Sequence, residues 1–194
     1  MRTGARKMRA TGKPAAVSVR IAPSVRSLAV ASLTEASTVD PTQPVIWANL
    51  AEAQARMGQS KTGDERTQFN EQAIASYRQA IALKPDDASF YNNLGLILVR
   101  MGKVEEGKAE LLKAAQADPI NSATYYYNLG ATMINTGNTE AAVEAFQKAI
   151  AAKPDHAEAH FQLGTALVGS AQIGEDGSIK PVPGTVEAFQ KYLA

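Results

Sequence analysis

The sequence predicts an all-α solenoid of about three and a half helix–turn–helix repeats. Two observations carry this prediction: a proline recurs at nearly constant spacing, and two apolar blocks alternate between successive prolines. The prolines lie 44, 34 and 35 residues apart, in short charged turns, at Pro41, Pro85, Pro119 and Pro154. A fixed period of roughly 20–50 residues is the signature of a repeat protein, in which each unit packs on its neighbours.

Each proline is followed by a block that predicts a first helix. The block places an aromatic residue or a histidine three residues before a leucine, and residues three or four apart share one helix face. A second block with helical spacing precedes the next proline, as in Ala73, Tyr77 and Ala80. The residues expected to form the repeat core are Trp47, Leu50, Tyr77, Tyr91, Leu94, Leu111, Tyr126, Leu129, Phe146, Leu163 and Phe189.

Glycines mark the expected helix ends and helix contacts. Gly58, Gly102 and Gly137 follow the first blocks, where a left-handed C-cap favours a residue without Cβ. Gly95 and Gly130 instead fall inside helices, where glycine costs about 1 kcal/mol relative to alanine. We attribute these two glycines to the close approach of neighbouring helices.

Together these features resemble the tetratricopeptide repeat, a unit of roughly 34 residues with the pattern W-x2-L-G-x2-Y, then A-x3-F-x2-A, then proline. About seven positions of this pattern recur four times over residues 27–194. The resemblance implies a right-handed α-solenoid whose first helices line a concave groove. It also implies a scaffold for protein–protein interaction that carries out no catalysis.

The expected organisation is a basic tail followed by one repeat array, 27–194. Extra residues occur near 59–68 and within 169–184, where Asp176-Gly177 favours a hairpin turn. We expect no polar capping helix at either end, although solenoids normally need one. The expected segments are a basic, disordered tail (1–26), a half repeat (27–43), a repeat with an insertion (44–87), two repeats (88–122 and 123–156), and an incomplete repeat (157–194) with a hairpin-like insertion (169–184).

Charge is unevenly distributed along the chain. Residues 1–26 carry seven basic groups and no acid, whereas residues 27–194 carry 13 basic and 19 acidic groups, a balance of −6. An acidic body argues against a nucleic-acid face on the main domain. The Arg-rich head resembles an organelle transit peptide. A disordered basic tail is favoured, and an upstream start codon is an alternative.

Composition excludes several classes of chemistry. The 194 residues include no cysteine and only two histidines, which excludes disulfides, thiol nucleophiles and Cys-ligated metal sites. No apolar run of roughly 18 residues predicts a transmembrane helix. A soluble cytoplasmic protein is favoured, with periplasmic or secreted locations as open alternatives.

Two short motifs suggest chemistry without supporting it. Gly102–Ala109 nearly matches the phosphate-binding loop, but Ala109 stands where a magnesium-binding hydroxyl is needed, and a helix rather than a strand precedes it. His156 and His160 lie four apart, as helical metal ligands do, yet His160 fills the aromatic slot of its repeat. We therefore expect no enzyme activity, no metal site and no cofactor.

The groove residues follow from the resemblance. Amides at equivalent sites of successive repeats would form a ladder of donors and acceptors that grips the backbone of an extended peptide. The residues expected to bind such a peptide, or a partner helix, are Asn49, Asn92, Asn93, Leu96, Arg100, Tyr127, Asn128, Asn135, Phe161 and Gln162. The pattern lacks the lysines and arginine of the carboxylate clamp that holds chaperone C-termini. The alternative is a structural subunit that self-associates end to end through uncapped solenoid ends, forming a homo-oligomer.

Overall fold

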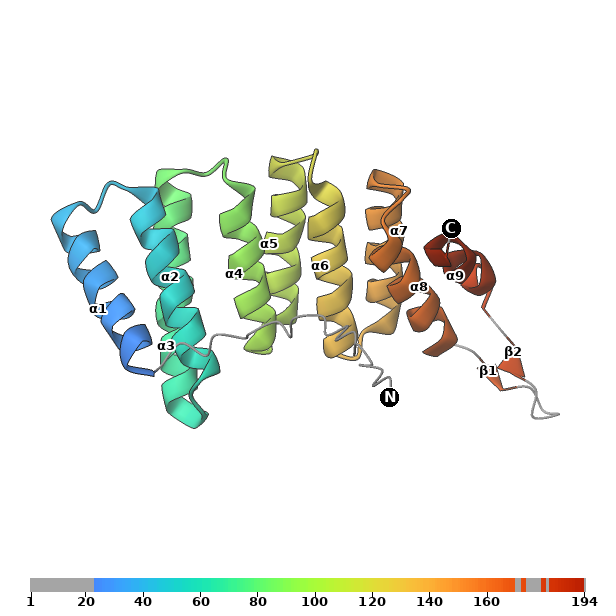
Figure 1. Ribbon diagram of the computed structural model, residues 1–194, viewed down its shortest axis with the longest axis horizontal. Helices are drawn as coiled ribbons and strands as arrows, with labels where there is room; N and C mark the ends of the chain where they lie inside the picture. Colours follow the sequence, from blue (N-terminus) through green and yellow to red (C-terminus); the bar gives the residue numbers. More distant parts are fainter. Residues whose placement is uncertain (1–22, 170–171, 174–178, 181, 194) are drawn as a thin grey trace, which may run out of the picture.

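The computed structural model describes residues 23–169, 172–173, 179–180 and 182–193. Its helices stand side by side in a curved row (Figure 1). In chain order the elements are α1 (Pro23–Val39), α2 (Pro44–Gln59), α3 (Gly63–Leu83), α4 (Ala88–Arg100), α5 (Val104–Ala117), α6 (Ser122–Asn135), α7 (Thr139–Ala152), α8 (Ala157–Gly169), β1 (Gln172–Ile173), β2 (Ile179–Lys180) and α9 (Thr185–Leu193).

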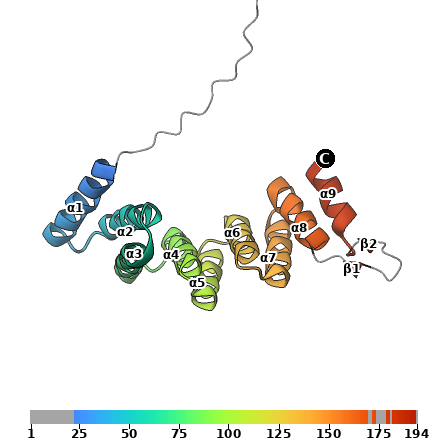
Figure 2. The same cartoon turned by 90° about the horizontal axis from the view of Figure 1, so that it is seen from below.

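Consecutive helices pack as pairs, and the pairs stack on one another. The pairs are α2 with α3, α4 with α5, α6 with α7 and α8 with α9, and α1 packs on α2. Seen from below, the row is an arc with α2, α4, α6 and α8 on its inner side and α3, α5 and α7 on its outer side (Figure 2). The predicted all-α, right-handed solenoid is thereby confirmed.

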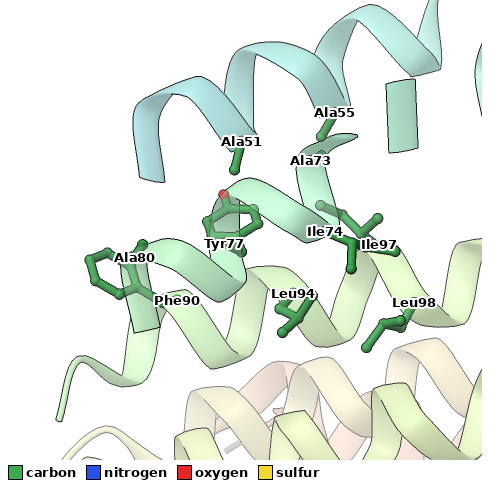
Figure 3. Packing of buried hydrophobic residues seen from close by; sticks show 10 residues of the cluster. All are labelled: Ala51, Ala55, Ala73, Ile74, Tyr77, Ala80, Phe90, Leu94, Ile97 and Leu98. Atoms are coloured by element: carbon green, nitrogen blue, oxygen red, sulfur yellow. The ribbon is translucent and has the colours of Figure 1, made fainter. Parts of the chain in front are cut away.

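Alanines fill much of the core. Figure 3 shows the first core cluster, in which Ala51 and Ala55 of α2 face Ala73 and Tyr77 of α3. Ala51 and Ala73 are fully buried. A second cluster continues through the later repeats and contains the fully buried Phe146. Small side chains at these positions let the helices approach closely, and the few large residues fill the remaining space.

Glycines inside helices mark the closest helix contacts, as predicted. A Cβ added to Gly130 would lie 2.6 Å from the ring of Phe146, and one added to Gly95 would lie 2.8 Å from the carbonyl oxygen of Gly107. Ordinary Cβ contacts lie at 3.4–4 Å. The absence of a side chain at Gly95 and Gly130 therefore allows the two helices of each repeat to touch.

Two of the three predicted glycine caps have left-handed conformation. Gly102 and Gly137 have φ of +79° and +77° and closely follow the ends of α4 and α6. The amide after each glycine bonds back into the helix, as in Lys103 N to Leu98 O at 3.0 Å, which is the Schellman arrangement. The prediction for Gly58 is wrong, because Gly58 is buried within α2 and does not have positive φ.

The two insertions take different forms. Part of the first, near 59–68, becomes the beginning of α3, which is 21 residues long. In the second, β1 pairs antiparallel with β2 in the register Gln172↔Lys180. The turn expected at Asp176-Gly177 lies outside the described residues, as do residues 1–22 of the expected tail. α1 begins at Pro23, which is four residues before the expected half repeat.

Candidate functional site

A repeated hydrogen bond orients the inner helices. In three repeats the residue of the aromatic slot donates to a proline carbonyl six positions earlier: Trp47 Nε1 to Pro41 O at 2.8 Å, Tyr91 Oη to Pro85 O at 2.9 Å, and His160 Nε2 to Pro154 O at 2.9 Å. The bond ties the start of each inner helix to the turn before it. Because a carbonyl only accepts, Nε2 of His160 carries the proton.

The turn before α6 differs from the other turns by one residue. Tyr126 lies seven positions after Pro119, so the neighbouring Tyr125 takes over the contact with the turn. Its hydroxyl donates to Asp118 Oδ2 at 3.3 Å. The inner face of α6 keeps its alignment with α4 despite the extra residue, since Leu129 and Gly130 hold the positions of Leu94 and Gly95.

Asparagine amides form a chain along the inner face. Asn128 Nδ2 of α6 donates to Asn92 Oδ1 of α4 at 2.9 Å, and Asn92 Nδ2 donates to Asn93 Oδ1 at 3.0 Å. Asn93 is in turn hydrogen-bonded to the hydroxyl of Tyr77 from α3. The chain therefore links α3, α4 and α6, which belong to three successive repeats.

The inner face has a cleft between α2 and α4. Its larger part has a volume of about 460 Å³, and an adjoining part towards the α3–α4 turn has about 360 Å³. Both parts share Glu52, Tyr77 and Asn93. The larger part is lined by Arg26, Glu52, Ala55, Arg56, Gln59, Tyr77, Asn93, Leu96 and Arg100. Volumes of roughly 300–1,000 Å³ are usual for ligand sites.

The cleft is positively charged. Its larger part contains three arginines and one carboxylate, and Arg56 pairs with Glu52 through Nε and Oε1 at 3.0 Å. Arg100 makes no ion pair within the part of the chain that the structure describes. Burial of the guanidinium lowers the pKa of Arg100, and the nearby charge of Arg66 lowers it further. Arg100 nevertheless remains accessible to solvent, and a guanidinium without an acidic partner favours the approach of an anion.

Tyr77 forms the floor of the cleft. Its side chain is 3% exposed, and burial raises the pKa of its phenol to about 12, although the hydrogen bond with Asn93 works in the opposite direction. The charge of Glu52 raises this pKa further, whereas Arg100 and Arg56 lower it. The hydroxyl is therefore neutral at physiological pH.

The groove residues predicted from sequence are spread along the inner face. Asn93, Leu96 and Arg100 line the large part of the cleft, and Asn49 lines its smaller part. Asn92 and Asn128 belong to the amide chain. The structure therefore brings four of the ten predicted residues into one cleft.

The remaining predicted residues lie towards the C-terminal half of the array. The ring of Tyr127 stacks on His156 with centroids 5.2 Å apart, and Phe161 contacts Tyr192 at 5.1 Å. Asn135 is exposed at the end of α6, and Gln162 is half-buried. Phe161 is 42% exposed, so it offers an apolar surface on α8.

Several residues of the cleft are absent from the predicted groove, among them Tyr77, Arg26 and Arg56. Tyr77 is expected only in the repeat core, Arg26 falls in the expected tail, and Arg56 lies among groove positions that carry no predicted binding role. One signal was present in the sequence: Arg56 and Arg100 are 44 residues apart, the same interval as Pro41 and Pro85. They therefore occupy the same position in consecutive repeats.

The two motifs that suggested chemistry have structural roles. Gly102–Ala109 forms the α4–α5 turn and the start of α5. His156 lies 3.3 Å from Glu158 and at the N-terminal end of α8, and His160 bonds to Pro154. Among the described residues, no group of three or more histidines and acids is placed to hold a metal ion.

The paired helices and the recurring slot residues define a helical repeat protein of the solenoid class. Family models match in three places: the TPR repeat model at residues 69–102 and 135–169, and the tetratricopeptide repeat model at 88–121. Residues 69–121 and 135–169 therefore match tetratricopeptide repeats. None of the described helices is both long enough and apolar enough to cross a bilayer.

Solved structures share the fold. MamA matches with a TM-score of 0.65 and 22% identity, covering 87% of this chain and 86% of its own. TTC0263, a thermophilic TPR protein from Thermus thermophilus, matches with a TM-score of 0.63 and 18% identity over 74% of each chain. PilF of Pseudomonas aeruginosa matches with a TM-score of 0.62 and 19% identity, covering 88% of this chain and 68% of its own.

One curated relative is more similar in sequence over a short stretch. The BBSome complex member bbs-4 of Caenorhabditis elegans is 44% identical over 50 residues. The match spans 26% of this chain and 11% of that protein. Its length is that of one to two repeats, so the likeness concerns the repeat unit.

Proposed function

We propose that this chain is a non-catalytic scaffold that binds an extended peptide or a partner helix along the inner face of its arc. The match to tetratricopeptide repeats supports a role in protein interaction. The cleft between α2 and α4 carries the proposal of groove binding, because it is a concave site with polar groups converging on it.

The amide chain suits the backbone of an extended ligand. Each asparagine side chain has two donor hydrogens and two acceptor lone pairs, and the bonds between Asn92 and Asn128 use only part of them. The remaining donors and acceptors would pair with peptide N–H and C=O groups. Tyr127 and Phe161 would contact apolar side chains of the same ligand.

A display experiment tests the proposal. A phage library of random dodecapeptides is selected on the immobilised full chain, and the selected peptides are labelled and titrated. We expect Asn128→Ala to weaken their binding at least tenfold. Gln79→Ala, an exposed amide on the outer helix α3, should leave it unchanged. Failure to select any peptide that competes for the inner face would overturn the proposal.

Exposed apolar residues at the terminal helices favour a second candidate, end-to-end self-association. Leu28 of α1 is 66% exposed, and Tyr192 and Leu193 of α9 are 44% and 80% exposed. Apolar side chains grouped in this way mark interaction sites. Contact between unlike ends would be heterologous, and repetition would give a filament unless the rotation closes.

Sedimentation velocity across a wide concentration range tests this second candidate. We expect the sedimentation coefficient of the native chain to rise with concentration. The variant Leu28→Asp should abolish that rise, because a charge at the contact is costly to desolvate. Thr34→Asp, an exposed position on the same helix, is the matched control. A single species at every concentration would dismiss self-association.

A further inference from the structure

We propose that the cleft between α2 and α4 selects peptides that carry a carboxylate side chain, which Arg100 and Arg56 bind. This inference rests on the proposed function and adds the chemistry of the ligand. The occupant is a protein segment with an aspartate or glutamate directed into the larger part of the cleft.

The cleft is positively charged, whereas the array as a whole carries a net negative charge. Arg26, Arg56 and Arg100 line one volume of about 460 Å³ together with a single acid, Glu52, whereas residues 27–194 together carry a charge of −6. A cleft with walls of low dielectric focuses the field of the charges that line it. An acidic side chain is therefore attracted to this place on the inner face.

Arg100 is the residue that we expect to bind the carboxylate of the ligand. Among the described residues no carboxylate lies within ion-pair distance of it, and the positive charge of Arg66 repels it. A guanidinium presents a fork of N–H donors that matches a carboxylate in two parallel hydrogen bonds. Leu96, one turn earlier on α4, provides an apolar wall for the methylene groups of the ligand.

Glu52 already neutralises part of the positive charge of the cleft. Its Oε1 accepts from Nε of Arg56 at 3.0 Å, and both side chains are more than half exposed. A ligand carboxylate at Arg100 would compete with Glu52 for Arg56 and would be repelled by Glu52 itself. This internal acid limits the number of negative charges that the cleft accepts, so a single carboxylate is favoured over a polyphosphate or a nucleic acid.

Removing the charge of an arginine in the cleft and removing the charge of Glu52 should change the affinity for an acidic peptide in opposite directions. The probe is a labelled peptide selected from the dodecapeptide library, together with its Glu→Gln version. We expect selected peptides to be enriched in aspartate and glutamate, and the Glu→Gln peptide to bind at least tenfold more weakly. Arg100→Gln should weaken binding of the acidic peptide at least tenfold and leave binding of the Gln peptide unchanged. Glu52→Gln should strengthen binding of the acidic peptide.

A control for overall charge is available on the outer side of the arc. Arg78 of α3 lies 3.9 Å from Glu106 and does not line the cleft. Arg78→Gln removes the same charge as Arg100→Gln and should leave affinity unchanged. Far-ultraviolet circular dichroism of each variant checks that the helices remain folded, and Arg56→Gln provides a second disruption of the site.

The outcomes separate carboxylate selection from groove binding. Peptides that bind but show no excess of acidic residues, or whose Glu→Gln version binds equally well, would overturn carboxylate selection and leave groove binding intact. Equal losses from Arg78→Gln and Arg100→Gln would attribute the effect to overall charge and would also overturn it. Selection of no peptide at all would overturn both.

Discussion

One buried polar pair shows how individual residues stabilise the first repeat. Ser76 Oγ of α3 donates to Gln54 Oε1 of α2 at 2.8 Å, and both residues are buried. The bond lies between helices that otherwise meet largely through alanines and Tyr77. Leaving a buried amide oxygen without its donor costs about 1–3 kcal/mol.

Ser76→Ala should therefore lower the free energy of unfolding by about 1–3 kcal/mol, measured by urea denaturation. Replacing both partners, as Gln54→Leu with Ser76→Ala, should recover part of the loss because no unpaired polar group remains. Ser32→Ala, at an exposed serine of α1, is the matched control and should change stability by less than about 0.5 kcal/mol. A double variant less stable than Ser76→Ala would contradict this account.

Because the phenol of Tyr77 is buried, we expect the stability of the fold to decrease at alkaline pH. Burial raises the pKa of its phenol from 10 to about 12, so the folded state favours the neutral form. The stabilisation is fully present below pH 10 and is lost as the pH rises through about 12. A shift of this size corresponds to about 2–3 kcal/mol.

Urea denaturation at several pH values from neutral to strongly alkaline checks this prediction. Native chain should lose stability more steeply above pH 10 than Tyr77→Phe, which has no phenol to ionise. Tyr126→Phe, at a half-buried tyrosine of another repeat, should keep the native slope. Parallel profiles for native chain and Tyr77→Phe would show that this phenol is not the cause.

At this scale the sequence predicts the role of a residue better than its surroundings. Tyr77 is correctly expected in the repeat core by its position, but helical spacing alone does not show that it borders an open cleft. The cleft depends on the separation of α2 from α4, which is a property of packing. Arg100 is found by repeat position, whereas the contribution of Arg26 requires the three-dimensional placement of α1.

At the scale of the helix, Gly130 is a position where added volume has no room. A Cβ there would lie 2.6 Å from the fully buried ring of Phe146. The first repeat has Ala51 and Tyr77 at the equivalent positions, so a repeat can hold a Cβ at this place when the opposing ring is arranged to suit it. Steric overlap in a core packed around glycine costs about 1–3 kcal/mol.

Gly130→Ala should lower stability by about 1–3 kcal/mol, and Gly130→Val by more, in thermal or urea denaturation. Gly169→Ala is the matched control, because nothing lies within 4 Å of a Cβ at that helical glycine. It should be neutral or stabilising by up to about 1 kcal/mol. Equal effects of alanine at Gly130 and Gly169 would show that the contact with Phe146 is unimportant.

Helix ends show why repetition in sequence does not guarantee repetition in structure. Gly58 and Gly102 are 44 residues apart and match in the repeat alignment, yet only Gly102 has positive φ. The insertion after Gly58 lets α2 run on to Gln59, and the left-handed glycine moves to Gly63. Gly58 instead packs against Asn70, whose Oδ1 would lie 2.7 Å from an added Cβ.

At the scale of the whole molecule, stability should vary along the row. Each repeat packs only on its neighbours, so a terminal helix has fewer packing partners than an internal helix. We expect amides of α1 and α9 to exchange with solvent faster than those of α4 to α7, in hydrogen-exchange mass spectrometry. Uniform protection from α1 to α9 would show that the array unfolds as one unit.

The amide chain on the inner side also determines how the arc can bend. Straightening the arc would pull the inner helices apart, and between α4 and α6 this motion must break the bond from Asn128 to Asn92. Among the described residues no side-chain hydrogen bond joins α2 to α4, and the cleft lies between them. We therefore expect the angle between α2 and α4 to change more easily than the angle between α4 and α6, and a ligand seated in the cleft to restrict that change.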